Sequence, residues 1–124
     1  MKYLAAVLLL AASVASNLGA YAVGSLDCNT SGASPLTSDA IASVDSWHND
    51  NSECCQTSST PCVTILTHGT ASVNLCGRQG FCTDKPTVAS VVGQLALICA
   101  QGSPEKSGGR VILQNGLSVE LFHS

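Results

Sequence analysis

The chain has 124 residues, including only two Phe, two Tyr and one Trp, so we expect one small domain with few large side chains in its core. Its formal net charge is −3, without basic runs, which argues against nucleic acid as a partner because nucleic-acid-binding surfaces are strongly basic. Seven cysteines in so short a chain indicate a disulfide framework rather than a cytosolic enzyme.

The N-terminus has the three-part layout of a secretory signal peptide. Lys2 precedes an apolar run, and small residues follow, with acceptable cleavage sites after Ser16 or Ala22. The apolar run spans about a dozen residues, short of the roughly 20 that a membrane-spanning helix needs. We therefore predict a signal peptide over residues 1–22 and a single exported, extracellular, disulfide-rich domain over residues 23–124, with no membrane span.

The cysteines all lie downstream of the predicted signal peptide and are all candidates for disulfides: Cys28, Cys54, Cys55, Cys62, Cys76, Cys82 and Cys99. Because seven is an odd number, one thiol is left free, capped or shared between two chains. We expect a monomer, with a dimer through the odd cysteine as the alternative. Paired Cys-x₂₋₄-Cys knuckles do not occur, so we predict neither a metal site nor a cofactor. The sequon Asn29-Thr30-Ser31 makes Asn29 a candidate for N-glycosylation.

The first half of the domain is predicted to contain a short strand near residues 25–28 and then a helix over residues 35–47. Thr37 or Ser38 is the expected N-cap of this helix, and Asp39 suits its first turn. Spacings of three and four give the helix one apolar stripe, formed by Ala40, Ile41, Val44 and Trp47. The Asn-, Ser- and Thr-rich segment 49–61 then has the composition of a surface loop, held in place only by its cysteines.

A first β-hairpin is predicted around Thr67-His68-Gly69. A three-residue loop with Gly69 in the left-handed conformation sets Ile65 opposite Ala71 on one face. Cys62 and Cys76 flank this hairpin and can bridge its strands after a small change of register.

The second helix is the clearest element of the sequence. Thr83 or Asp84 is its expected N-cap, Pro86 suits its first turn, and Gly102 is expected to stop it. Its predicted buried stripe is Val88, Val91, Val92, Leu95, Ile98 and Cys99. Because Cys99 ends this stripe, we predict that it is bridged and that the bridge fixes the helix to the sheet.

A second hairpin closes the chain around Gln114-Asn115-Gly116. A two-residue Asn-Gly turn would mix polar and apolar side chains on both faces, so we predict a three-residue loop with Gly116 left-handed. This register pairs Leu113 with Leu117 and sets Arg110 across from Glu120. The order of elements predicts an α+β fold, an antiparallel sheet with two helices packed on one face, stapled by disulfides.

The segment Leu75-Cys76-Gly77-Arg78-Gln79-Gly80-Phe81-Cys82, the helix that ends in Cys99 and the closing strand 117–121 together resemble the small α/β-sandwich killer toxins of fungal viruses and their secreted fungal relatives. The resemblance covers residues 62–124, about half of the chain. It implies an exported, non-enzymatic, toxin-like or effector protein that acts on an extracellular target, a surface component or ion-transport protein of a host or competing cell. Block of calcium uptake in those toxins is tied to exposed basic residues, which are few in this chain, so we do not extend the resemblance to channel block.

Two basic residues are the candidates for binding. Arg78 lies between Cys76 and Cys82 in a loop flanked by glycines, where a contact costs little ordering entropy. Lys85 stands beside the start of the second helix. The alternative for both is an ordinary solvated charge, and Trp47 is expected to belong to the core.

Two other functions are the alternatives. A small secreted ribonuclease would use His and Glu, and His48, His68, His123 and Glu120 are available. Glu120 and His123 lie three residues apart, however, which places them on opposite faces of a strand, so we predict no catalytic residues and no enzyme.

A hydrophobin-like surface protein is the second alternative, because the Cys54-Cys55 doublet is a mark of those secreted surfactants. Hydrophobins have eight cysteines with two such pairs, whereas this chain has seven cysteines and one pair. An obvious long apolar loop, which a surfactant needs for its exposed patch, does not occur either.

Overall fold

The computed structural model of the protein describes residues 25–124, so the predicted signal peptide lies outside the described residues. The elements in chain order are β1 (Leu26–Cys28), α2 (Thr37–Ser43), the 3₁₀ helix η1 (Asp45–Trp47), β2 (Glu53–Cys55), β3 (Cys62–His68), β4 (Ala71–Cys76), β5 (Cys82–Asp84), α3 (Lys85–Ile98), β6 (Gly109–Ile112) and β7 (Ser118–His123). None of the helices in this range is long and apolar enough to cross a membrane.

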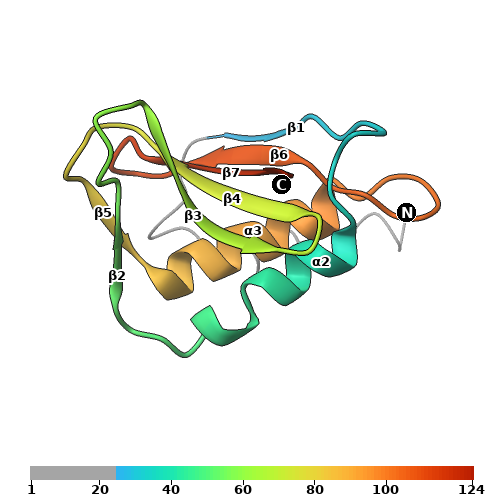
Figure 1. Cartoon of the computed structure of the whole chain (residues 1–124), viewed down its shortest axis with the longest axis horizontal. Helices are drawn as coiled ribbons and strands as arrows, with labels where there is room; N and C mark the ends of the chain where they lie inside the picture. The colour runs from blue at the N-terminus through green and yellow to red at the C-terminus, as the bar shows by residue number, and fades with distance from the viewer. Residues whose placement is uncertain (1–24) are drawn as a thin grey trace, which may run out of the picture.

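The described residues form an α+β fold, as the sequence predicts. Five strands make one antiparallel sheet in the order β1-β6-β7-β4-β3, and β2 and β5 make a separate two-stranded sheet. Helices α2 and α3 lie side by side on the same face of the five-stranded sheet (Figure 1). The two-stranded sheet lies at one end of this sandwich and leads directly into α3 (Figure 1).

The core lies between the helices and the inner face of the main sheet. Its fully buried side chains alternate along β4 and β7 and recur every three or four residues along α3: Val73, Leu75, Val88, Val91, Val92, Leu95, Val119 and Leu121. The opposite face of the sheet is polar, and one row crosses all five strands: Asp27, Arg110, Glu120, Asn74 and Thr64. Glu120 therefore lies on the outer face, away from the helices.

The first helix is shorter than predicted, and its cap is different. Leu36, not Thr37 or Ser38, is the N-cap of α2, and its apolar side chain makes no capping hydrogen bond. The Thr37 hydroxyl lies 2.7 Å from the Ser107 hydroxyl instead. After Ser43, whose hydroxyl donates to the Ala40 carbonyl at 2.7 Å, the chain continues as η1. Ile41 lies within α2 but is 41% exposed, so its predicted place in the buried stripe is wrong.

The first hairpin differs in register from the prediction. His68, not Ile65, is opposite Ala71, the turn is Gly69-Thr70, and β3 is bulged between Thr64 and Leu66. Gly69 does have the expected positive φ of 56°. The predicted loop is one residue too long because Thr70 in the turn is held by Asp39 of α2, which is distant in the sequence. The bulge supplies the change of register that brings Cys62 opposite Cys76.

The second hairpin has the predicted register. The Leu113 amide donates to the Leu117 carbonyl at 2.7 Å, Arg110 is opposite Glu120, and Gly116 has a φ of 88°. The three-residue loop therefore keeps the apolar side chains of both strands on the inner face.

Helix α3 is capped as predicted but ends early. The Asp84 side chain accepts a hydrogen bond from the Thr87 amide at 2.7 Å. The helix ends at Ile98, and its C-cap Cys99 precedes the expected stop, Gly102, by three residues. Cys99 is held there because the Thr30 hydroxyl donates to its carbonyl at 2.6 Å and a disulfide bonds it to Cys28. Ile98 is 58% exposed, so its assignment to the buried stripe is wrong.

The segment 49–61 is not a plain loop. It contains β2, which pairs antiparallel with β5 so that Cys55 is opposite Cys82. The strand is only three residues long, and its sequence lacks the apolar alternation that identifies a strand.

Candidate functional site

Three disulfides join six of the seven cysteines, all of which lie in the described part of the chain. Cys28 bridges Cys99, Cys55 bridges Cys82, and Cys62 bridges Cys76, whereas Cys54 is unpaired. The predicted bridge at Cys99 is confirmed, and it ties the end of α3 to β1. The bridge across the first hairpin is confirmed as well.

The loop formed by residues 77–81, the 77–81 loop, connects β4 to β5 and begins and ends at a disulfide. Cys76 precedes it and is bonded to Cys62, and Cys82 follows it and is bonded to Cys55. Gly77 and Gly80 have φ values of 133° and 90°, which favour glycine at both positions. The sequence places these two glycines on either side of Arg78 and Gln79.

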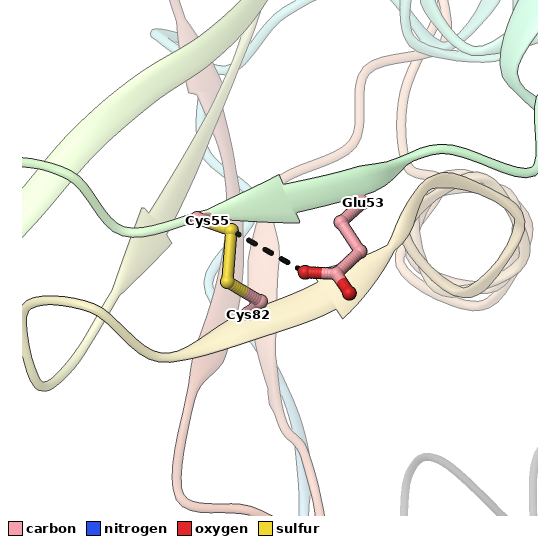
Figure 2. A group of neighbouring side chains, drawn as sticks. All are labelled: Glu53, Cys55 and Cys82. Carbon is pink, nitrogen blue, oxygen red and sulfur yellow. Dashed lines mark hydrogen bonds between the residues drawn. A yellow bond between two sulfur atoms is a disulfide. The ribbon is translucent and has the colours of Figure 1, made fainter.

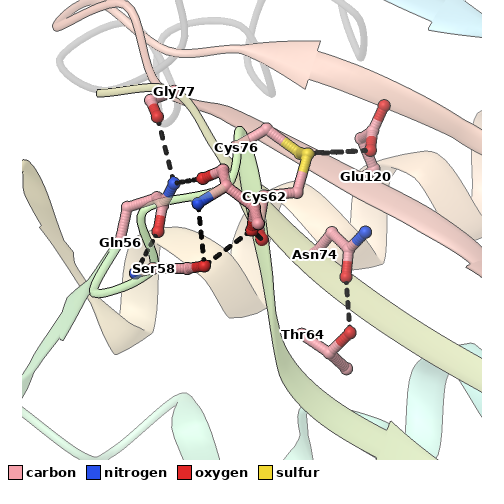
Figure 3. Close-up of a disulfide and its surroundings, with 9 residues drawn as sticks. Gln56, Ser58, Cys62, Thr64, Asn74, Cys76, Gly77 and Glu120 are labelled. Atoms are coloured by element: carbon pink, nitrogen blue, oxygen red, sulfur yellow. Dashed lines mark hydrogen bonds between the residues drawn. A yellow bond between two sulfur atoms is a disulfide. The ribbon is translucent and has the colours of Figure 1, made fainter. Parts of the chain in front are cut away.

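Gln56 is hydrogen-bonded to the 77–81 loop through both its side chain and its backbone. Its side chain is fully buried, and its amide nitrogen donates to the Thr60 carbonyl at 2.7 Å and the Gly77 carbonyl at 3.1 Å (Figure 3). Its side-chain oxygen accepts from the Ser58 amide at 2.7 Å. Its backbone binds the loop too, since the Gly80 amide donates to the Gln56 carbonyl and the Gln56 amide donates to the Phe81 carbonyl. Sequence reasoning missed Gln56 because nothing distinguishes it from the polar residues around it.

Arg78 and Phe81 are both exposed on the 77–81 loop. The Arg78 guanidinium carbon lies 5.7 Å from the centre of the Phe81 ring, which is cation–π geometry, and Phe81 is 38% exposed. The other three cationic side chains of residues 25–124 have oxygen partners: Lys85 with Asp50, Arg110 with Asp27 and Lys106 with the Gly32 carbonyl. Arg78 thus presents its guanidinium to solvent with an aromatic ring beside it.

Lys85, the other predicted binding residue, is engaged within the protein. Its ammonium nitrogen lies 3.0 Å from Asp50 Oδ2 and 4.9 Å from the centre of the Trp47 ring. Hydrogen bonds from the Ser52 hydroxyl and amide, together with the one from Lys85, lower the pKa of Asp50 to about 2. Trp47 is partly buried and packs against the core. The cation therefore joins η1 to the first turn of α3.

The histidines weighed for acid–base chemistry are exposed and lie apart along the chain. His48 follows η1, and His68 ends β3 beside the hairpin turn. His123 Nδ1 lies 2.8 Å from the Ser124 carbonyl oxygen, whereas Glu120 Oε1 lies 3.1 Å from the Cys76 sulfur. Glu120 and His123 are thus engaged with different groups.

Two clusters combine a carboxylate with two cysteines. Glu53 lies with Cys55 and Cys82 (Figure 2), and Glu120 lies with Cys62 and Cys76 (Figure 3). In each cluster the two sulfurs are bonded to one another. Disulfide sulfurs are not thiolates, and it is the thiolate that binds metal, so we assign no metal site here.

No protein-family model matches this chain, and a search of curated proteins finds no significantly similar sequence. The architecture itself, a small α+β domain with three disulfides among the described residues, is consistent with a cysteine-rich, toxin-like fold.

The last two predicted positions are the odd cysteine and the sequon. Cys54 is 7% exposed and belongs to the hydrophobic core, and burial raises the pKa of its thiol. A bond between two chains through Cys54 would therefore require the core to open. Asn29 lies on the exposed segment after β1, where it lines a cleft of about 190 Å³ with Ser34 and Phe122.

Proposed function

We propose that this is an exported, non-enzymatic, toxin-like protein that binds a surface component or ion-transport protein of another cell through its 77–81 loop. The observation that carries the proposal is the pairing of Arg78 with Phe81 on a loop that starts and ends at a disulfide. The N-terminal segment with the layout of a signal peptide supports export.

The 77–81 loop is suited to binding because most of its ordering entropy is already lost in the free protein. Two disulfides and the buried Gln56 fix its ends and its centre. A rigid loop loses little further conformational freedom on binding, and each immobilised side chain otherwise costs about 0.5–1.5 kcal/mol. Arginine and large aromatic side chains carry a disproportionate share of binding energy in protein interfaces.

The net charge of the protein and the exposed guanidinium of Arg78 indicate which kind of target surface the 77–81 loop can bind. Without Lys2 the chain has four basic and eight acidic residues, a formal net charge of −4, so long-range attraction to an anionic surface is weak. The Arg78 guanidinium favours short-range, bidentate contact with a carboxylate or a comparable planar anion. We therefore propose a protein target with an acidic side chain beside an apolar pocket that accepts Phe81.

The resemblance to the fungal killer toxins supports the same role. The segment that carries it, residues 75–82, contains the whole 77–81 loop. Members of that group are non-enzymatic antagonists of other cells, and this chain is proposed to be similar in role.

The test is binding to cells and its effect on them. The purified mature protein is applied to a panel of candidate host and competitor cells, and bound protein, growth and calcium uptake are measured. R78Q and F81A are each expected to reduce cell binding at least about tenfold, since truncation of a hot-spot residue costs about 2 kcal/mol or more and about 1.4 kcal/mol corresponds to a tenfold change in affinity. R110Q, which removes the same charge from the outer face of the sheet, is the matched control and is expected to bind normally. Equal binding by R78Q and R110Q, or hydrolysis of RNA or glycan without cell binding, contradicts the proposal.

A further inference from the structure

Each disulfide at the ends of the 77–81 loop has a carboxylate against its sulfurs. Glu120 Oε1 lies 3.1 Å from the Cys76 sulfur and 3.9 Å from the Cys62 sulfur (Figure 3). Glu53 Oε2 lies 3.7 Å from the Cys55 sulfur (Figure 2). Within residues 25–124 only these two disulfides form such a cluster, and the Cys28–Cys99 bridge does not.

The sheet registers create both contacts. Cys76 is opposite Ser118, and Glu120 lies two residues further along β7 on the same outer face, so it is a diagonal neighbour of the disulfide. Glu53 precedes Cys55 by two residues in β2 and therefore points to the same face of that strand. Neither contact depends on a flexible loop.

The charge of Glu120 is not neutralised by the group it touches. A disulfide sulfur carries no proton, so it donates no hydrogen bond to the carboxylate. Arg110, the cross-strand neighbour of Glu120, has its ion pair with Asp27 instead, at 3.9 Å. A half-buried negative charge thus lies directly beside the Cys62–Cys76 bond.

This charge opposes the chemistry that breaks the bond. A thiolate attacks one sulfur and forms a mixed disulfide, while the other sulfur leaves as a thiolate with the bonding electron pair. A second reagent thiolate then attacks the reagent sulfur of the mixed disulfide, which forms the oxidised dimer of the reagent and releases the second cysteine as a thiolate. In the first step negative charge approaches and also develops within a few ångströms of the carboxylate, and Coulomb repulsion raises that barrier.

We propose that Glu120 and Glu53 protect the two disulfides of the 77–81 loop from reduction by anionic thiols, and so preserve the loop where such thiols are present. Glu120 is expected to slow reduction more than Glu53 does, because Glu120 is closer to sulfur and half-buried, whereas Glu53 is exposed and its charge is better screened by salt.

The experiment measures the reduction rate of each disulfide in the intact oxidised protein by quenched alkylation and peptide mapping. Three thiols are compared whose reactive thiolate forms differ in net charge: glutathione (−2), 2-mercaptoethanol (−1) and cysteamine (zero). E120Q is expected to speed reduction of Cys62–Cys76 by glutathione roughly two- to tenfold, with a smaller gain for 2-mercaptoethanol and the smallest for cysteamine. E53Q is expected to act in the same order on Cys55–Cys82, more weakly, and 1 M salt is expected to reduce both differences because the Debye length is then about 3 Å.

E105Q is the matched control, since Glu105 is exposed on the loop between α3 and β6, and it is expected to leave all three rates unchanged. A substitution that merely loosens the fold would accelerate reduction by all three thiols equally. Equal acceleration, or no acceleration by E120Q, overturns the proposal. These rates do not depend on any cell target, so the outcome is independent of the proposed function.

Discussion

The Asp39 carboxylate binds Thr70 twice: Oδ2 accepts a hydrogen bond from the Thr70 amide and another from the Thr70 hydroxyl, both at 2.8 Å. Asp39 is in the first turn of α2, and Thr70 is in the turn of the first hairpin. The Thr70 hydroxyl in turn accepts from the Leu36 amide at 2.9 Å. A single side chain therefore joins the start of a helix to a β-turn 31 residues later.

The first prediction is that D39N destabilises the protein in a pH-dependent way. Hydrogen bonds from the backbone and the hydroxyl of Thr70 lower the pKa of Asp39 below 3.8. A carboxyl whose folded pKa is lowered stabilises the fold above its unfolded pKa, and this stability is lost as the pH falls through the folded pKa. We expect D39N to melt a few degrees below the native protein near pH 7 and the difference to vanish in acid below the folded pKa.

Thermal unfolding followed by circular dichroism from pH 2 to pH 7 checks this expectation. D45N is the control, because Asp45 is exposed in η1. A melting difference for D39N that stays the same from pH 7 to pH 2 would show that the contact acts through shape rather than charge.

The contact between Asp39 and Thr70 explains why the sequence predicts the register of the second hairpin correctly but not that of the first. The second hairpin was predictable because its own side chains decide the register: only the three-residue loop keeps Glu120 and Ser118 off the inner face. The first hairpin was not, because its turn is fixed by Asp39, which local pattern reasoning does not connect to Thr70. Tertiary contacts of this kind override local turn preferences.

Some features of the candidate site were likewise predictable from the sequence and others were not. The flanking cysteines identify Arg78 as a residue on a rigid loop, and this holds because the disulfides are encoded on either side of it. The pairing of β2 with β5 places the Phe81 ring beside Arg78 and buries Gln56 against the 77–81 loop. That small sheet has no sequence signal, since its strands are three residues long and polar.

The second prediction concerns Gln56. Q56L keeps the volume of the side chain but leaves the carbonyls of Thr60 and Gly77 and the amide of Ser58 without their partner. An unsatisfied buried group costs about 1–3 kcal/mol, and these three bonds are only partly buried, so we expect a total loss of about 2–4 kcal/mol in the free energy of unfolding. Urea denaturation measures it.

The control for Gln56 is Q79L. Gln79 is exposed and donates only to the Thr57 carbonyl, at 3.2 Å, so its loss is expected to change the free energy of unfolding by less than about 0.5 kcal/mol. If both variants lose the same stability, Gln56 is not the residue that holds the 77–81 loop to the segment 58–60.

The third prediction concerns the odd cysteine. Because Cys54 is buried and its thiol pKa is raised, we expect iodoacetamide to leave it unmodified in the folded protein and to alkylate it only in denaturant. C54A is expected to retain the pairings 28–99, 55–82 and 62–76 by mass-spectrometric mapping and to remain monomeric. A disulfide-linked dimer that disappears in C54A would contradict the buried position of Cys54.

The fourth prediction concerns the causes of the low Asp50 pKa. The Ser52 hydroxyl donates to Asp50 Oδ1 at 2.6 Å, the Ser52 amide donates to the same oxygen at 3.0 Å, and Lys85 acts through both a hydrogen bond and its charge. The pKa of Asp50 is lowered to about 2, and we expect S52A and K85M each to raise it, with neither variant restoring the ordinary value alone.

Titration of the Asp50 carboxyl by NMR separates these contributions, and Trp47 gives an independent signal. The ammonium of Lys85 lies over the Trp47 ring, so K85M is expected to change Trp47 fluorescence while S52A does not. Because the folded pKa is lowered, the stability that Asp50 provides is present above its unfolded pKa and is lost as the pH falls through about 2. If either variant leaves the pKa of Asp50 unchanged, the contact that this variant removes is not a cause of the low pKa.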